Sequence, residues 1–254
     1  MTKLKGVLFD YGHTLVYFPN IKKTHLIAAR NVQKMLHDLG VSVNASKIQT
    51  TVESFAHRTD DVVMDMEKEF MEILHILGVE NYSQEDLQEI IHAYWRPYIQ
   101  NARIRRGAKK LLEFLKKIEL RLGIVANIWS GGMNPVLQRL GIERFFDTTV
   151  ASVDVGFKKP DPKIFLLALD HLGLSPEEVI MVGDSPRTDI QGAHDLGIAT
   201  VRLMRGPNRA KPDLVDPDFK IRNLSALASI VQARTQIDRN LTEPRATPVS
   251  KSQS

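Results

Sequence analysis

The stretch of residues 5–15, KGVLFDYGHTL, decides how the rest of the chain is interpreted. A short apolar run, residues 6–9, ends at Asp10, and the residues after it, which include Gly12 and His13, are typical of a turn. Such a short run, bounded by polar residues, is typical of a buried β-strand. We therefore expect a strand that carries an acidic side chain at its carboxyl end.

After Gly107 the chain alternates between helical stretches and short runs rich in β-branched residues. The expected helices are 108–118, 135–140, 163–172 and 189–196, and the expected strands are 122–126, 148–151, 179–182 and 200–203. This alternation predicts right-handed βαβ units and a mostly parallel sheet that is covered by helices on both faces. The strand at 6–9 then belongs to the same sheet, and the fold class is α/β.

Residues 21–98 have a helical hydrophobic period instead. Apolar residues recur every three to four positions up to Gly40 and again up to Gly78. Ser83 and Asp86 resemble a capping box that starts a third helix, which we expect to end near Pro97. These patterns predict an all-helical unit that is inserted after the first strand.

The composition is that of an ordinary globular protein. The 254 residues include 34 Lys and Arg against 30 Asp and Glu, and this net charge of +4 is too small to indicate a nucleic-acid-binding protein. The most basic stretch, residues 103–110, we interpret as the solvated face of a helix. The absence of cysteine excludes a disulfide framework, a thiolate nucleophile and zinc sites with sulfur ligands.

Hydropathy gives no sign of a membrane protein. No run approaches the roughly 18 apolar residues of a membrane span, and the basic start of the chain precedes only four apolar-compatible residues, too few for a signal peptide. We expect a cytoplasmic protein with neither nucleic-acid nor membrane partners. No pattern in the sequence indicates the oligomeric state.

Acidic residues follow two of the expected strands. Asp10 follows the first strand, and Asp184 follows the strand at 179–182, with Asp189 five residues later. Because ligands bind outside the carboxyl ends of the strands in such sheets, Asp10 and Asp184 are expected to meet there. Carboxylates that lie close together repel each other unless a cation separates them, and oxygen ligands favour Mg²⁺.

Three motifs resemble those of the haloacid dehalogenase (HAD) superfamily of hydrolases. They are FDYGHTL at 9–15, KPDP at 159–162, and GDSPRTD at 183–189 followed by Gly192 and Ala193. The resemblance covers roughly residues 5–231. It implies a Rossmann-like core, dependence on Mg²⁺ and hydrolysis of small phosphorylated metabolites, most often phosphate monoesters.

The same resemblance implies a division of the chain into units. Residues 1–16 and 103–232 would form the HAD-like catalytic core, and residues 17–102 would form an α-helical cap domain. Residues 233–254 are rich in Thr, Pro, Ser, Gln, Asn and Arg, and we expect them to form a disordered tail because they have little apolar surface to bury.

Roles carry over from the family by position. Asp10 would be the nucleophile that forms an aspartyl-phosphate, and Lys159 would hold both this nucleophile and a phosphoryl oxygen. The implied metal site contains Asp10, the backbone carbonyl of Gly12, Asp184 and Asp189. Asp189 would act there by orienting Lys159 or a metal-bound water.

Two positions depart from the family pattern. Gly12 replaces the Asp that serves phosphatases as general acid and base, and Ala126 replaces the Ser or Thr that bonds the phosphoryl group. Asn127, or backbone N–H groups near Ala126, would restore part of the second contact. His13 is a candidate substitute for the missing acid, although its position also suits a turn residue at the hinge of the cap.

Three alternatives therefore remain open. The first is that the substrate is an acyl phosphate, whose good leaving group needs little protonation. The second is that the protein keeps the fold and binds phosphate but turns over slowly or not at all. The third is dehalogenation, which needs no acid. That branch of the family works without Mg²⁺, so Asp184 and Asp189 favour phosphate chemistry.

Overall fold

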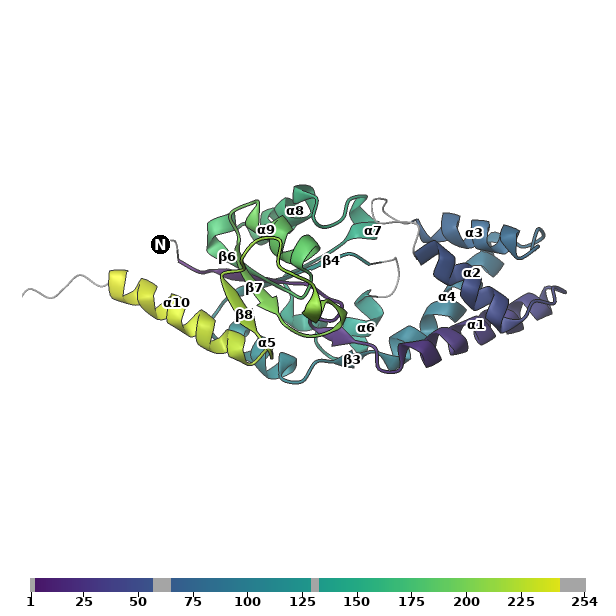
Figure 1. The fold of residues 1–254 in the computed structure, drawn as a ribbon, viewed down its shortest axis with the longest axis horizontal. Helices are drawn as coiled ribbons and strands as arrows, with labels where there is room; N and C mark the ends of the chain where they lie inside the picture. Colours follow the sequence, from purple (N-terminus) through teal and green to yellow (C-terminus); the bar gives the residue numbers. More distant parts are fainter. Residues whose placement is uncertain (1–2, 57–64, 129–132, 243–254) are drawn as a thin grey trace, which may run out of the picture.

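A computed structural model of the chain describes residues 3–56, 65–128 and 133–242 (Figure 1). Within these residues, six parallel strands form one sheet in the order β5-β4-β1-β6-β7-β8. The strands are β1 (Gly6–Phe9), β4 (Arg121–Ala126), β5 (Thr148–Ala151), β6 (Val179–Gly183), β7 (Ala199–Leu203) and β8 (Phe219–Ile221). The expected α/β class and the parallel Rossmann-like sheet are confirmed.

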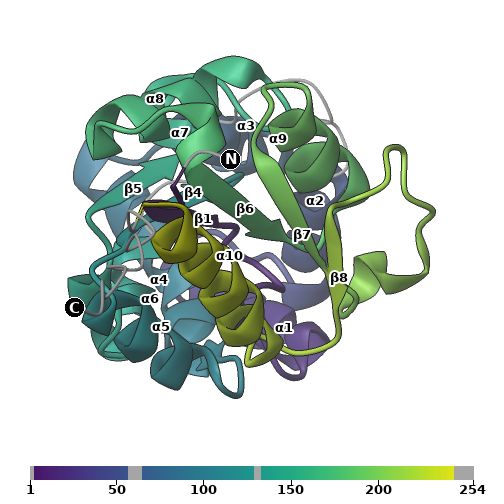
Figure 2. The same ribbon diagram turned by 90° about the vertical axis from the view of Figure 1, so that its left-hand side faces the viewer.

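The two faces of the sheet bury alternate residues of the same strand. Val7 and Phe9 face one apolar cluster, whereas Leu8 faces the other, and all three are fully buried. The first face is covered by α5 (Ala108–Lys117), α6 (Met133–Arg139) and α10 (Ala226–Thr242), and the second by α8 (Pro162–Leu172) and α9 (Gly192–His194) (Figure 2). Each fully buried Leu or Phe contributes roughly 1.5–3 kcal/mol, so these clusters hold the strand ends in place.

Short elements complete the core. The loop after β5 contains α7 (Ser152–Val155), and single turns lie at η1 (Glu143–Phe145), η2 (Pro176–Glu178) and η4 (Pro207–Ala210). The helix expected at 189–196 begins earlier, as a π-helical turn η3 (Pro186–Gln191) that continues into α9. Ser185 caps this turn, because its side chain accepts a hydrogen bond from the Thr188 N–H at 3.3 Å.

The inserted residues form a helical unit with its own apolar cluster. It contains α1 (Ile21–Asp38), α2 (Ala45–Ala56), α3 (Met66–Ile76) and α4 (Gln84–Asn101), and it lies at one end of the elongated molecule (Figure 1). A short antiparallel pair, β2 (Val16–Tyr17) with β3 (Arg103–Ile104), connects it to the core. The capping box of Ser83 and Asp86 is present at the start of α4.

One expected helix end differs from the structure, and one helix was not expected. Helix α4 continues through Pro97 to Asn101, where Tyr98 packs into the apolar cluster of the helical unit. Helix α10 was not expected; Leu227 and Val231 bury its first half against the sheet, and it runs on to Thr242, past the core boundary predicted at residue 232. The rest of the expected tail, residues 243–254, lies outside the described residues.

Candidate active site

Asp10 follows β1 in the middle of the sheet, between β4 and β6. Its backbone N–H donates to the Val182 carbonyl at 2.9 Å, and its side chain is buried. One carboxylate oxygen, Oδ1, accepts a hydrogen bond from Lys159 Nζ at 2.8 Å. The other, Oδ2, is buried and has no hydrogen-bond partner among the described residues, so it remains available to a ligand.

Lys159 is held at both its backbone and its side chain. The Asn127 amide accepts from the Lys159 N–H and donates to the Lys159 carbonyl, each at 2.8 Å. The buried ammonium donates to Asp10 and, at 2.7 Å, to Asp189 Oδ1. Burial alone would lower the pKa of Lys159, but the charges of Asp10 and Asp189 outweigh it and raise the pKa, so this lysine is a cation at neutral pH.

Asp184 and Asp189 lie at the end of β6, beside Asp10. Asp184 is buried, and its Oδ2 accepts from Asn208 Nδ2 at 3.1 Å. Asp189 Oδ2 accepts from the Ser185 N–H at 2.9 Å, and this packing requires Gly183, where a Cβ would lie 2.3 Å from that oxygen. One ligand oxygen each from Asp10, Asp184 and Asp189 lies within 4.8 Å of the others.

The charges of this cluster do not balance. Burial and the charge of Asp189 raise the pKa of Asp10 to about 6, and burial with the charges of Asp10 and Asp189 raises the pKa of Asp184 to about 7. One lysine faces three carboxylates, so a further cation would stabilise the ionised forms. The unpartnered Oδ2 of Asp10 and the oxygen-only donor set fit Mg²⁺.

The arrangement separates the roles of the acidic residues. Asp189 accepts one hydrogen bond on each oxygen, from Lys159 and from the Ser185 N–H, so it holds the lysine in place. Its expected place at the metal site stays a prediction. Asp10, Asp184 and Asp189 are the side chains that could hold a metal, with the carbonyl of Gly12 on the loop that follows Asp10.

Asn127 positions the lysine, because both polar atoms of its side chain bond the backbone of Lys159. Its Nδ2 has a second N–H, so its expected contact with a phosphoryl group stays a prediction. Ala126 is buried at the end of β4 and offers no hydroxyl there. A Cβ added at Gly12 would meet no atom within 4 Å, so the space that an Asp side chain would occupy is open.

His13 lies on the loop after β1, in the left-handed region at φ 60°, and part of its surface is exposed. Its backbone carbonyl and that of Thr14 accept hydrogen bonds from the Arg105 guanidinium. Partial burial and the charge of Arg105 lower the pKa of His13, so its imidazole is neutral at pH 7. This residue therefore lies at the site but is also part of a fixed turn.

The sequence did not indicate Asn208. It comes from the turn η4, after β7, and reaches back to Asp184 across the end of the sheet. No strand-end position or motif marks it, because its place depends on the path of the loop.

Comparison with known proteins agrees with this geometry. Residues 42–203 match the family model of the haloacid dehalogenase-like hydrolases. The chain belongs to this family. It is a HAD-type hydrolase, as the motifs at Asp10, Lys159 and Asp184 had indicated.

Curated relatives of this HAD-type hydrolase are named as phosphatases. A glyceraldehyde 3-phosphate phosphatase of Methanocaldococcus jannaschii is 29% identical over 237 residues, which cover 90% of this chain and 97% of the relative. A second protein of that name, from Pyrococcus abyssi, is 30% identical over 208 residues and covers 80% of this chain and 82% of the relative. A ribulose-1,5-bisphosphate 5-phosphatase of Halopiger xanaduensis is 27% identical, with 77% and 83% covered.

Solved structures share the fold of the HAD-type hydrolase. A HAD phosphatase from Thermococcus onnurineus superposes with a TM-score of 0.64 at 24% identity and covers 90% of this chain and 98% of that one. A 2-haloacid dehalogenase from Pseudomonas syringae gives a TM-score of 0.68 at 24% identity, with 91% and 99% covered. Separately, none of the helices in the described part of the chain is long and apolar enough to span a membrane.

Proposed function

We propose that this protein is a Mg²⁺-dependent phosphatase that hydrolyses a small phosphate monoester or acyl phosphate through an aspartyl-phosphate on Asp10. The observation that carries the proposal is the state of the Asp10 carboxylate, with one oxygen fixed by Lys159 and the other buried without a partner. The phosphatase names of the curated relatives support the same reaction class. The expected cytoplasmic location stays a prediction.

In the proposed reaction, Asp10 attacks the phosphorus in line with the leaving group. A bond forms between the carboxylate oxygen and phosphorus while the bond to the leaving oxygen breaks, and water later hydrolyses the aspartyl-phosphate to release inorganic phosphate. Lys159 has three N–H donors, of which two bind Asp10 and Asp189, so one remains for a phosphoryl oxygen. When held by Asp10, Asp184 and the Gly12 carbonyl, Mg²⁺ would supply positive charge against the phosphoryl oxygens.

Gly12 stands where phosphatases of the family have an acidic residue, and this limits which leaving groups the protein can protonate. A general acid contributes about 10²–10⁴ in rate, and no carboxyl stands at this position. His13 is the side chain nearest in sequence that could replace it, but its lowered pKa means that little of its imidazole carries the acidic proton at pH 7. We therefore propose a preference for substrates with a good leaving group, such as acyl phosphates.

The helical unit is proposed to act as a cap. Residues 17–102 would close over the carboxyl ends of the strands, exclude water and select the substrate, while residues 1–16 and 103–232 form the catalytic core. The antiparallel pair of β2 and β3 is the hinge in this proposal, since both connections between the two units pass through it.

Turnover of p-nitrophenyl phosphate and acetyl phosphate, with and without Mg²⁺, tests the proposal. We expect Mg²⁺-dependent hydrolysis that falls at least about 10³-fold in Asp10→Asn, because the nucleophile is lost. His13→Ala tests the substitute acid, and a loss of less than about tenfold argues against that role. Activity that Asp10→Asn leaves intact would refute the nucleophile.

A second candidate function is supported by Gly12 and Ala126 together. A protein that lacks both the acid and the phosphoryl-binding hydroxyl could keep the fold and bind phosphate without efficient turnover. Absence of Mg²⁺-dependent activity on both substrates, together with measurable phosphate binding, would favour this candidate. Release of halide from 2-haloacids without Mg²⁺ would instead favour the dehalogenase reaction, which we rank lowest because of Asp184.

A further inference from the structure

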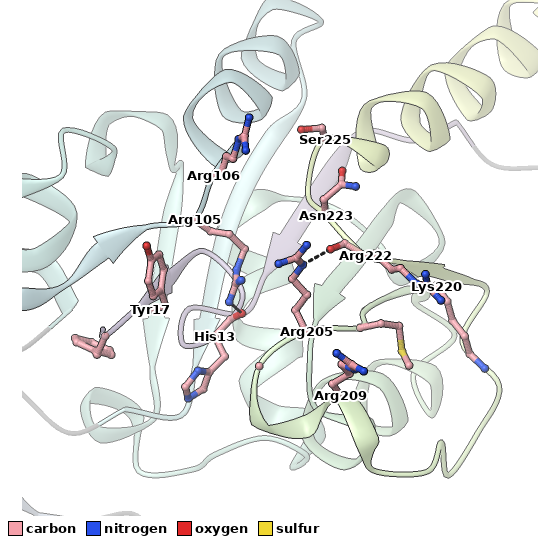
Figure 3. A pocket seen from close by; sticks show the side chains of 13 residues that line it. His13, Tyr17, Arg105, Arg106, Arg205, Arg209, Lys220, Arg222, Asn223 and Ser225 are labelled. Carbon is pink, nitrogen blue, oxygen red and sulfur yellow. Dashed lines mark hydrogen bonds between the residues drawn. The ribbon is translucent and has the colours of Figure 1, made fainter. Parts of the chain in front are cut away.

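A basic cavity lies beside the carboxylate cluster. It has a volume of about 1440 Å³ and lies where the loop after β7 faces β8 and the loops next to β2 and β3 (Figure 3). Among its lining residues, as far as the chain is described, there is no Asp or Glu. The cationic side chains that line it are Arg105, Arg106, Arg205, Arg209, Lys220 and Arg222.

Most of these charges have no acidic partner. Lys220 forms an ion pair with Asp213 at 2.8 Å, whereas no carboxylate of the described residues lies within ion-pair distance of Arg105 or Arg205. Arg105 Nε donates to the Thr14 carbonyl at 2.9 Å, and Arg205 Nε donates to the Arg222 carbonyl, which does not neutralise either guanidinium. Burial and the nearby charge of Arg205 lower the pKa of Arg105, and the charge of Asp184 opposes this shift only in part.

The loop after β7, which carries Arg205 and Arg209, is held in place by the buried side chain of Arg202. Arg202, at the end of β7, is buried and forms an ion pair with Asp213. Its Nη2 also donates to the carbonyls of Asn208 at 2.8 Å and Lys211 at 2.7 Å. The loop is therefore held in shape before any ligand arrives, which lowers the entropic cost of binding.

Gly206 connects this cavity to the carboxylate cluster. It lines the cavity at φ +76°, and a Cβ at this position would lie 3.2 Å from His13 Cβ and 3.4 Å from Asp184 Oδ2. This wall of the cavity therefore packs against Asp184 and His13, so a molecule whose phosphate is attacked by Asp10 would lie close to the cavity. Its far end would then meet the unpaired guanidinium groups.

We propose that the cavity binds a second oxyanion group, phosphate or carboxylate, at the far end of the substrate. The substrate class is then a bisphosphate or a phosphorylated acid, which rests on the phosphatase function proposed above. Guanidinium groups bind both oxyanions through paired, charge-assisted hydrogen bonds. The cavity is also larger than the roughly 300–1,000 Å³ typical of ligand pockets, so it has room for an extended substrate.

Binding to the inactive Asp10→Asn variant tests this proposal without turnover. Isothermal titration calorimetry in Mg²⁺ compares two matched pairs of probes, fructose 6-phosphate with fructose 1,6-bisphosphate and glycerol 3-phosphate with 3-phosphoglycerate. We expect the member with the second oxyanion to bind at least about tenfold more tightly in one or both pairs. The first pair reports on a phosphate and the second on a carboxylate.

Substitutions in the same background assign the effect to the cavity. Arg205→Gln and Arg209→Gln should each reduce the affinity ratio between the two probes of a pair to within about threefold. The control is Arg144→Gln, which should leave this ratio unchanged, because Arg144 is exposed and stacks on Phe145 outside the cavity. Equal affinity within both pairs, or a preference that survives both cavity substitutions, overturns the proposal. Thermal unfolding checks that each variant is folded. If Arg205→Gln does not fold, the result for Arg209→Gln decides, because Arg209 is exposed.

This result is separate from the fate of the phosphatase function. A wild-type protein without Mg²⁺-dependent phosphate release refutes the proposed function, even if the calorimetric preference is present. A phosphatase that shows no preference within either pair refutes only the second-oxyanion site.

Discussion

At the scale of single residues, the position of Lys159 shows how the site is organised. Its backbone is clamped by Asn127, and its ammonium is shared between Asp10 and Asp189. The lysine is therefore fixed before substrate binds, which is what phosphoryl transfer requires of a residue that acts by positioning and charge.

Restoring the missing acid is the most specific prediction at this scale. The space at Gly12 is open, so Gly12→Asp should be accommodated. We expect it to raise kcat on substrates with poor leaving groups by about 10²-fold, because a general acid becomes available, and to have little effect on acetyl phosphate. Steady-state kinetics of both substrate types measure this. Gly12→Asn is the matched control, and an equal gain in both variants would contradict the prediction.

The raised pKa values of Asp10 and Asp184 predict how pH affects stability and metal binding. Their folded pKa values of about 6 and about 7 lie above the ordinary 3.8, so the folded protein holds these protons more tightly than the unfolded chain. The stabilisation that they give the metal-free protein is complete below pH 3.8 and is lost as pH rises through about 6 to 7. At higher pH both groups are charged and repel, and a cation relieves this.

We therefore expect Mg²⁺ to raise the Tm more at pH 8 than at pH 5, where protons compete with the metal. Differential scanning calorimetry with and without Mg²⁺ at the two pH values measures the difference. In Asp184→Asn the effect at pH 8 should be reduced. A shift in Tm that is the same at both pH values would show that these carboxylates do not hold the ion.

The sequence predicted those site residues that follow strand ends. Asp10 and Asp184 lie next to each other because β1 and β6 pair in register, and short apolar runs bounded by polar residues identify such buried strands. The partners of Asn127 were not predictable, since they depend on how the backbone before Pro160 passes the end of β4. Asn208 and the arginines of the cavity lie on loops, which carry no periodic signal.

At the scale of elements, the loop after β7 depends on a buried charge. Arg202→Leu removes the ion pair with Asp213 and the hydrogen bonds to two backbone carbonyls. Asp213 still forms its ion pair with Lys220. We expect the free energy of unfolding to fall by about 2–3 kcal/mol, as for the loss of hydrogen bonds to a charged group. Urea unfolding measures this, with Arg144→Leu as a surface control that changes it by less than about 0.5 kcal/mol. A similarly small loss in Arg202→Leu would show that the loop is held elsewhere.

Elements with strong hydrophobic periods were predictable, and weakly apolar ones were not. The strand β8 was missed because its three residues, FKI, follow a stretch rich in Pro and Asp. Helix α10 was not predicted, because its later residues are polar and only Leu227 and Val231 mark the buried side. Pro97 was taken as a helix end, although α4 accommodates it near its last turn.

At the scale of the whole molecule, the net charge of +4 is less informative than its distribution. The basic residues 103–110 were expected on a solvated helix face, yet Arg105 is half-buried and lines the cavity with Arg106. Charges from segments that are distant in the sequence meet there, beside a cluster of carboxylates. Only the folded chain brings these two regions together.

The most direct test of the account is detection of the phosphoryl group on Asp10. Without an acid or base at Gly12, hydrolysis of the intermediate should be slow enough for it to accumulate. Acid quenching during turnover of acetyl phosphate with Mg²⁺, followed by peptide mass spectrometry, is predicted to find one phosphoryl group on the peptide that contains Asp10 and none in Asp10→Asn. Turnover without this modification, or the same modification in Asp10→Asn, would contradict the account.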